Sequence, residues 1–247
     1  MDGALAWLMG PLTGLFTGAA PHSIAPWAAW HARCMVLAWA VLLPLGVLAA
    51  RFFKITPGQR WPQVLDNPAW WHAHRALNYT GVALVAVGLL IAWGHAGSSD
   101  LTAQLHGWLG WLLSAAAALQ IAGGLLRGSK GGPTDAQARG DHYDMTPRRM
   151  AFERLHKRGG WLALVVAVAV IGLGLVVADA PRWMALVLTA WWLLLLAAFV
   201  ALQRSGRCLD TYQAIWGPGV QHPGNRLPVS GWGVRRPGAG LQTRPKP

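Results

Sequence analysis

Four of the nine histidines lie inside long hydrophobic segments and not in polar loops. They are His31, His74, His106 and His156. Neutral imidazole is a common metal ligand, and an ionisable side chain inside a membrane span indicates a functional site because burying it there is costly. A single histidine near a membrane boundary is more often a hydrogen-bonding residue than a metal ligand. The arrangement of the four histidines therefore decides between these two roles.

Five hydrophobic segments position these histidines. Each can cross a hydrocarbon core of ~30 Å, which needs about 20 helical residues. The predicted helices cover 28–52, 71–94, 104–126, 155–178 and 183–203. The composition agrees, because 12% of the residues are charged and 54% are hydrophobic, whereas about 25% are charged in a typical soluble domain. We therefore predict an all-α integral membrane helical bundle with five transmembrane helices in contact with lipid, and an ordinary soluble enzyme is excluded.

The direction of each helix sorts the histidines into two pairs. The first and third helices begin on one face of the membrane, here side A, and the second and fourth begin on the other, side B. His31 and His106 therefore share a depth near side A, and His74 and His156 share one near side B. Haem iron can take one axial nitrogen from each side of the macrocycle. Two such pairs predict two b-type haems in a four-helix core, bound non-covalently because the sequence has no Cys-x-x-Cys-His motif.

Basic side chains stand beside the predicted ligands. Arg33, Arg75, Lys157 and Arg158 each follow one of the four histidines by one or two residues. Haem propionates need cations or water, and charge-assisted hydrogen bonds to carboxylates are strong. We therefore expect these four residues to contact the propionates as part of the cofactor-binding site. No catalytic residue is assigned.

Glycines also accompany the histidines. They are Gly81 and Gly88 after His74, Gly110 after His106, and Gly159 and Gly160 after His156. Glycine leaves room for a flat ring beside a ligand, but small residues equally let two membrane helices pack closely. The glycines alone do not distinguish the two roles.

The other five histidines are expected outside the metal sites. His72 precedes His74 by two residues and so points about 200° around the helix from it, toward the membrane interface. The remaining four lie in connecting segments and are expected to be solvated: His22, His95, His142 and His222. Loop residues 140–146 are rich in polar and aromatic groups, and they are candidates for docking a partner or covering the haem near side B.

The basic residues indicate the orientation of the chain. With each helix end assigned to its nearest loop, side B carries 19 of the 21 Lys and Arg residues, and side A carries only Arg33 and Arg182. Cytoplasmic loops of membrane proteins are enriched in Lys and Arg. Side B, with the C-terminus, is therefore predicted to be cytoplasmic. The formal charge of +12 follows from this topology, so nucleic acid is not expected as a partner.

Three parts are predicted along the chain. They are an N-terminal interfacial segment (1–26), a transmembrane domain (27–203) and a cytoplasmic tail rich in Pro, Gly and Arg (204–247). Residues 4–20 are apolar but contain three glycines and a proline, so an interfacial or periplasmic helix is expected there, with a sixth crossing as the alternative. Residues 217–247 lack hydrophobic periodicity and are expected to be extended or partly ordered.

Four segments resemble the cytochrome b561 family, specifically its bacterial members that consist of this domain alone. They are HARCMVLAWAVLLPLGVLAARFF, WWHAHRALNYTG, LHGWLGWLLSAAAALQIAGG and ERLHKRGGW. The similarity covers most of 27–203. Gln120, fourteen residues after the third of the paired histidines, belongs to the pattern, whereas Asn78 stands where relatives often carry Gln. The resemblance implies a place in the bacterial inner membrane, favours His74 over His72, and implies the same pairing that helix direction predicts.

The function predicted from these features is transmembrane electron transfer through two haems, between a redox partner, protein or small molecule, on one side and an acceptor on the other. The nearest alternative is a quinone-reactive di-haem cytochrome b that anchors a dehydrogenase or hydrogenase. An alternative from another class is a non-redox transporter or assembly factor whose histidines hydrogen-bond between helices. The ascorbate-binding residues of the six-helix animal and plant members cannot be carried over, so the electron donor and the oligomeric state stay open.

Overall fold

The computed structural model describes residues 14–18, 22–95, 97 and 100–236. Within these ranges the chain forms helices and connecting loops, and its β-type pairings are two isolated bridges, Leu15 with Pro181 and Leu209 with Arg235. Most of the predicted N-terminal helix at 4–20 lies outside the described residues. In its described part, the backbone N–H and the hydroxyl of Thr17 both donate to the carboxylate of Asp179.

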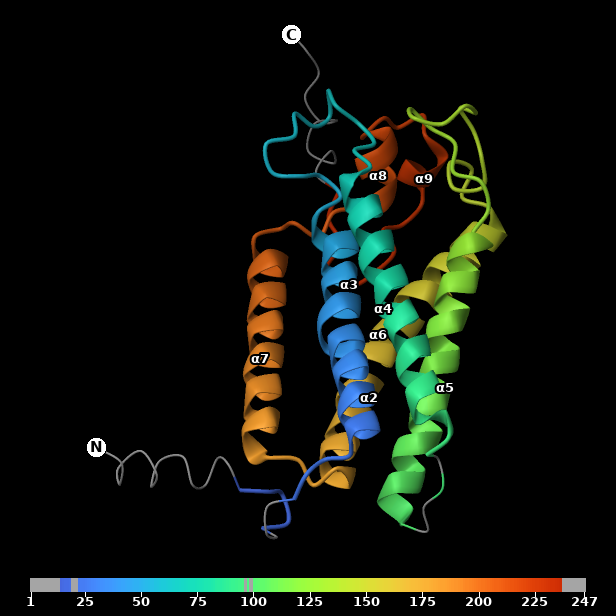
Figure 1. The fold of residues 1–247 in the computed structure, drawn as a ribbon. Helices are drawn as coiled ribbons and strands as arrows, with labels where there is room; N and C mark the ends of the chain where they lie inside the picture. The colour runs from blue at the N-terminus through green and yellow to red at the C-terminus, as the bar shows by residue number, and fades with distance from the viewer. Residues whose placement is uncertain (1–13, 19–21, 96, 98–99, 237–247) are drawn as a thin grey trace, which may run out of the picture. The chain divides into compact units, whose positions relative to one another are not determined.

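Five helices are long and apolar enough to cross a membrane (Figure 1). They span Pro26–Phe52, Ala69–Trp93 (α4), Leu101–Leu125 (α5), Pro147–Val177 (α6) and Arg182–Arg204 (α7). The first of them is built from α2 (Pro26–Val36), the π-helix η1 (Leu37–Leu42) and α3 (Leu43–Phe52). The chain is therefore an all-α membrane helical bundle, and the predicted fold class is confirmed.

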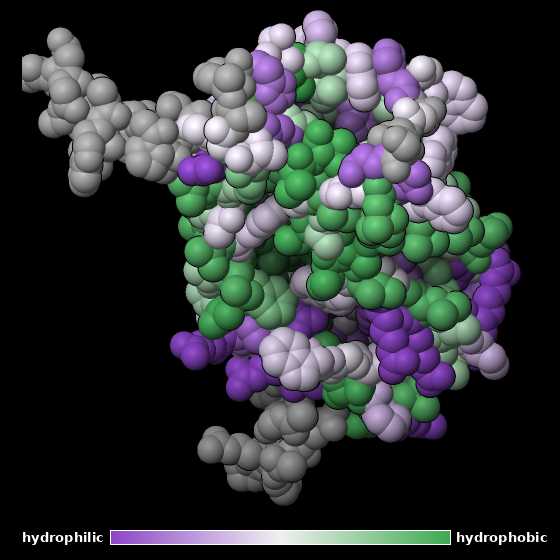
Figure 2. All heavy atoms as spheres, turned by 90° about the horizontal axis from the view of Figure 1, so that it is seen from below, coloured by the Kyte–Doolittle hydropathy of each residue, from purple (hydrophilic) through white to green (hydrophobic). Residues whose placement is uncertain are grey.

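Large apolar side chains are exposed on the helix surfaces. Leu90, Trp108 and Leu119 are 74%, 77% and 72% exposed. Figure 2 views the molecule from below, and on that face hydrophobic residues occupy much of the middle, with polar residues around them. A soluble protein rarely exposes large apolar patches, whereas lipid chains are as apolar as leucine. The exposed apolar surface is consistent with helices that face lipid.

The chain divides into two compact units. Unit 1 consists of Met1–Pro44, Tyr79–Leu119 and Trp161–Ala197. Unit 2 consists of Leu45–Asn78, Gln120–Gly160 and Ala198–Pro247. His31 and His106 belong to unit 1, and His74 and His156 belong to unit 2. Each predicted histidine pair therefore lies within a single unit.

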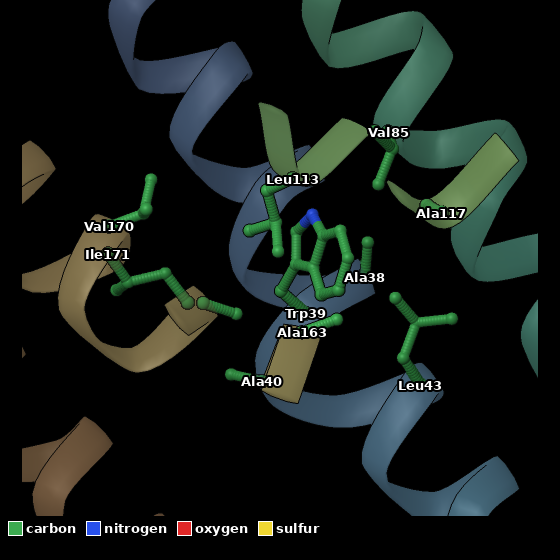
Figure 3. Close-up of a cluster of buried hydrophobic side chains, with 11 residues drawn as sticks. Ala38, Trp39, Ala40, Leu43, Val85, Leu113, Ala117, Ala163, Val170 and Ile171 are labelled. Carbon is green, nitrogen blue, oxygen red and sulfur yellow. The ribbon is translucent and has the colours of Figure 1, made fainter. Parts of the chain in front are cut away.

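The core of unit 1 surrounds Trp39, whose side chain is 6% exposed. Figure 3 shows its indole in the middle of a cluster that includes Leu113 and Ala163. Alanines recur in this cluster, because small side chains let the helices of a membrane bundle approach closely. The cluster packs residues from η1, α4, α5 and α6 together.

Pro44 gives the first membrane helix its one irregular segment. A proline has no backbone N–H, so it cannot donate the helical hydrogen bond to the carbonyl four residues earlier, here that of Ala40. The indole Nε1 of Trp191 on α7 donates to that carbonyl at 2.7 Å. A side chain from another helix therefore satisfies the carbonyl, which is how membrane helices tolerate proline.

Helix α6 begins at Pro147, eight residues before the predicted start at 155. The additional turns carry charged residues, which interrupt the hydrophobic run but suit a helix. Arg149 pairs with Glu153 four residues later, and Glu153 pairs with Lys157. Such spacing brings opposite charges together on one helix face, so the polar residues extend α6 beyond its apolar part.

The C-terminal segment of unit 2 is described as far as Arg236. It contains α8 (Thr211–Trp216) and α9 (Pro223–Arg226) (Figure 1). On α8, Tyr212, Ile215 and Trp216 are buried and pack with Tyr143 and Met145 of the loop before α6. The guanidinium of Arg236 donates to the Asp210 carboxylate and to backbone carbonyls of residues 224, 225 and 227. In its described part, which ends at residue 236, the tail that was predicted to be extended or partly ordered thus packs against the loop before α6 through α8 and is linked by the hydrogen bonds of Arg236.

Candidate functional site: two histidine pairs

His31 on α2 and His106 on α5 face each other in unit 1. Their ring centres are 6.2 Å apart and the ring planes cross at 80°. The Nδ1 atom of His31 lies 2.9 Å from the carbonyl oxygen of Gly88 on α4. The Nδ1 atom of His106 lies 3.1 Å from the carbonyl oxygen of Val170 on α6. Four helices of unit 1 thus hold this pair.

His74 on α4 and His156 on α6 face each other in unit 2. Their ring centres are 6.3 Å apart and the ring planes cross at 73°. The Nδ1 atom of His74 lies 2.9 Å from the carbonyl oxygen of Gly46 on α3. The Nδ1 atom of His156 is buried and has no hydrogen-bond partner among the described residues. The four histidines therefore come together in the two pairs that helix direction predicts.

The hydrogen bonds determine which ring nitrogen is free. A carbonyl oxygen can only accept, so Nδ1 of His31 and His106 must carry the hydrogen and donate it. The 2.9 Å contact with the Gly46 carbonyl assigns the same role to Nδ1 of His74, since the approach of the Asn78 amide nitrogen to that atom is longer, at 3.2 Å. In a neutral imidazole Nε2 then keeps its lone pair. In metal sites a ligating histidine almost always donates its other N–H to such a partner. Three of the four rings thus have the protonation pattern of a metal ligand.

The geometry of both pairs fits one ion between two imidazoles. With a metal–nitrogen bond of about 2.0 Å and a ring centre ~1.1 Å behind the bonded nitrogen, two imidazoles on opposite sides of one ion have ring centres ~6.2 Å apart. The observed separations are 6.2 Å and 6.3 Å. Among the described residues, no His, Cys, Asp and Glu side chains form a metal-binding group of three or more. Each site offers two protein ligands, as haem iron requires because the macrocycle supplies the other nitrogens.

The glycines near the histidines have two different roles. A Cβ on Gly81 would lie 3.0 Å from Leu43, and one on Gly88 would lie 3.0 Å from Met35. These two glycines therefore let α4 pack closely against the first membrane helix, which is the second of the two roles that the sequence left open. A Cβ on Gly110 or Gly160 would meet no atom within 4 Å, so space exists one turn beyond His106 and His156.

Gly46 supports His74 by allowing a close approach of Asn78. A Cβ on Gly46 would collide with the side-chain amide of Asn78. Asn78 in turn donates its Nδ2 hydrogen to the backbone carbonyl of His74 at 2.6 Å. The absence of a side chain at residue 46 therefore lets its carbonyl reach the His74 ring.

The four predicted propionate-binding cations are all exposed. The guanidinium carbon of Arg33 lies 4.8 Å from the ring centre of Trp30, and that of Arg75 lies 5.8 Å from that of Trp71. The ammonium group of Lys157 lies 2.7 Å from a carboxylate oxygen of Glu153. His72 is exposed, in contrast to His74, which agrees with its predicted place at the interface.

Sequence reasoning missed Trp71 and Arg127 in unit 2. The Trp71 ring stacks near His74, with ring centres 5.9 Å apart and an interplanar angle of 26°. The guanidinium carbon of Arg127 lies 4.0 Å from the centre of the Trp71 ring. Trp71 is three residues before His74, so helical spacing could have indicated the first contact. Arg127 follows the end of α5, and no local pattern indicates its position over Trp71.

His142 is buried, so its predicted solvated position is wrong. The side chain is about 3% exposed, and its ring lies 4.7 Å from that of Trp216. Its Nε2 atom lies 3.4 Å from both the Arg149 guanidinium and the Glu153 carboxylate. Burial, and then the charge of Arg149, lower the pKa of His142 to about 3. The loop before α6 is therefore anchored inside unit 2 by a neutral histidine.

Five membrane helices and two facing histidine pairs define a multi-pass membrane protein with two candidate bis-histidine metal sites. No family model and no solved structure matches the chain. Among curated proteins, ferric-chelate reductase 1 of Bos taurus is 33% identical over 146 residues and that of Homo sapiens is 30% identical over 145 residues. Each match covers 59% of this chain and 22% of the relative.

A cytochrome b561 and DOMON domain-containing protein of Arabidopsis thaliana is 36% identical over 92 residues, which are 37% of this chain and 18% of that protein. The chain thus spans about a fifth of the length of the relatives that it matches. The chain is related to the cytochrome b561 family, which confirms the family part of the predicted resemblance. The relationship implies that it binds b-type haem.

Proposed function

We propose that the chain binds two b-type haems, each between two histidines, and passes electrons through them across the membrane. The observation that supports this most directly is the pair of ring-centre separations, 6.2 Å for His31 with His106 and 6.3 Å for His74 with His156. Both separations match the ~6.2 Å that one ion between two imidazoles requires, and the match recurs in two pairs on different helices. The relationship to cytochrome b561 proteins supports the same cofactor.

In this proposal Nε2 of each histidine binds iron, and no ligand is shared between the two sites. The haem, when bound, supplies one-electron redox chemistry. The chain holds the imidazoles in position, because three backbone carbonyls accept the Nδ1 hydrogens and fix the tautomer and the orientation of three rings. The apolar surroundings restrict water access, which is one of the factors that set the potential of a haem.

The propionates are assigned to the basic residues beside the ligands. Arg33 is assigned to the site of unit 1, and Arg75, Lys157 and Arg158 to the site of unit 2. Their exposed positions leave them accessible to a carboxylate. Lys157 already pairs with Glu153, but an ammonium group has three donors, so it can hold a propionate at the same time.

The orientation proposed for the chain follows the basic residues. Side B, which carries 19 of the 21 Lys and Arg residues, is assigned to the cytoplasm. The C-terminus and the His74–His156 site then belong to the cytoplasmic side, and the His31–His106 site belongs to the opposite side. The membrane proposed for the chain is the bacterial inner membrane.

The names of the relatives suggest the first acceptor to test. Two of them are named ferric-chelate reductase 1. We therefore propose a ferric chelate as an electron acceptor of this chain. A reductant on one side of the membrane would then reduce the chelate on the other through the two haems.

The test is the haem content and redox behaviour of the purified chain. Pyridine haemochrome analysis is expected to give two haems b per polypeptide, and electron paramagnetic resonance is expected to give low-spin bis-histidine signals. In proteoliposomes with a reductant inside and a ferric chelate outside, reduction of the chelate should depend on the protein. One haem or none per chain would contradict the proposal, and the complete lack of a haem spectrum would favour a non-redox membrane protein.

A further inference from the structure

His156 differs from the other three paired histidines in its hydrogen bonding. The other three each donate from Nδ1 to a backbone carbonyl at 2.9–3.1 Å. Nδ1 of His156 is buried without a partner. A buried donor that makes no hydrogen bond is costly, and a histidine that ligates a metal almost always has a partner for its second nitrogen. An acceptor for His156 is therefore expected nearby.

A second buried atom without a partner lies on the neighbouring helix. It is the side-chain oxygen Oε1 of Gln120 on α5. This oxygen is an acceptor, whereas Nδ1 of His156 is a donor when Nε2 binds iron. The two orphaned atoms are thus complementary, and both belong to unit 2.

The packing of α5 on α6 brings Gln120 to the level of His156. The amide nitrogen of Gln120 lies 2.7 Å from the position that a Cβ on Gly159 would occupy. Three residues along α5, a Cβ on Gly123 would lie 3.8 Å from the Phe152 ring, and that ring is 5.0 Å from the His156 ring. Contacts with α5 thus flank His156 on both sides along α6. Gly159 is small where the Gln120 amide needs space.

We propose that Gln120 is a positioning residue for His156. Its Oε1 accepts the Nδ1 hydrogen through one bridging water, because the two atoms are not hydrogen-bonded to each other directly. This inference rests on the proposed function, because it assigns Nε2 of His156 to iron. The hydrogen bond fixes the tautomer and the ring orientation of His156, and it makes the imidazole a stronger donor to the metal. A stronger ligand stabilises ferric over ferrous iron.

The consequence is that one haem can be tuned through a side chain. The acceptors of His31, His74 and His106 are backbone carbonyls, which a substitution cannot delete. The proposed acceptor of His156 is an amide side chain. Its replacement changes the donor strength of the His156 imidazole, while His156 itself stays the ligand. The haem of unit 2 is thus the one whose midpoint potential depends on residue 120.

The test compares Q120L and Q120E with the wild type in the purified full-length chain with its haems. Q120L removes the acceptor and is expected to favour the ferrous state of one haem about tenfold, an upward potential shift of about 59 mV for one electron. Q120E keeps an oxygen acceptor and is expected to hold that haem at or below the wild-type potential. Redox titration and electron paramagnetic resonance report both effects, and the other haem serves as the internal reference.

Two further variants separate hydrogen bonding from packing. Q104L changes an exposed glutamine on the same helix and is expected to leave the haem of unit 2 unchanged. G159A places a methyl group against the Gln120 amide and is expected to shift the same haem as Q120L while Gln120 is still present. If Q120L leaves both potentials and both spectra unchanged, or if Q120L and Q120E have the same effect, the proposal is wrong. A wild-type chain without two haems would instead contradict the proposed function.

Discussion

The indole nitrogen of Trp191 donates a 2.7 Å hydrogen bond to the carbonyl oxygen of Ala40. This carbonyl lacks its helical partner because residue 44 is proline. The bond connects α7 with the first membrane helix, and both residues belong to unit 1. Helix α7 carries none of the four paired histidines. It thus stabilises the irregular segment η1 of the first membrane helix.

Loss of this bond is expected to destabilise the protein. W191F leaves the Ala40 carbonyl unsatisfied and should lower the free energy of unfolding by about 1–3 kcal/mol, measured as a lower melting temperature in detergent. W192F, a change at the neighbouring tryptophan, should cost less. P44A restores a backbone N–H, so W191F should cost less in the P44A background. Equal costs in both backgrounds would show that the bond does not depend on Pro44.

Substitutions of the proposed ligands are expected to remove the two proposed haems selectively. H31A or H106A should remove one haem, and H74A or H156A the other, because the two pairs share no ligand and lie in separate units. Haem content and the reduced-minus-oxidised spectrum measure each loss. H72A is the control, and it should keep both haems because His72 is exposed. Loss of a haem in H72A but not in H74A would reverse the assignment on α4.

Gly46 is expected to be intolerant of a side chain. In G46A the new methyl group collides with Asn78 and moves the carbonyl that accepts from His74, so the haem of unit 2 should be lost or its spectrum shifted. G172A is the matched helix control, since a Cβ there meets nothing within 4 Å. The double variant G46A/N78A removes the collision and should recover haem binding. If G46A binds haem as the wild type does, the close approach has no role in the site.

The burial of His142 is expected to make stability depend on pH. Its pKa is about 3 in the folded chain and about 6.5 when unfolded, so the unfolded state binds the additional proton between these values. The contribution of His142 to the free energy of unfolding is therefore fully present above pH 6.5. It falls as the pH drops toward 3, by up to about 1.4 kcal/mol per pH unit. Unfolding in detergent should show a steeper acid slope for the wild type than for H142Q. The carboxylates titrate in both proteins, so identical slopes would contradict a buried neutral His142.

Helix direction was sufficient to pair the histidines. His31 and His106 both lie near the start of helices that run the same way, and so do His74 and His156, so membrane depth alone brings the correct rings together. The helix ends were predicted within three residues except at α6, where Arg149 and Glu153 interrupt the hydropathy but pair with each other. Hydropathy measures the apolar part of a helix and not its full length.

The surroundings of the sites could not be predicted in the same way. The position of His142 depends on α8, which packs on it from about 70 residues further along the chain. Gly81 and Gly88 lie on the same stripe as His74, yet they contact the first membrane helix. Periodicity identifies a face of a helix but not the neighbour of that face. The buried charges of Lys54 and Asp66 were missed for the same reason, since their partners Leu209 and Lys130 are distant in sequence.

Unit 2 cannot be completed until residues beyond the fifth membrane helix have been synthesised. Its last part begins at Ala198, and α8 within that part covers Tyr143 and Met145. Chains generally fold from the N-terminus as they emerge from the ribosome, and unit 1 has its whole sequence once Ala197 has been made. A chain interrupted after α7 would contain all five membrane helices and both histidine pairs but would lack the segment that closes over the loop before α6. Translation order thus separates the synthesis of the five membrane helices from the completion of unit 2.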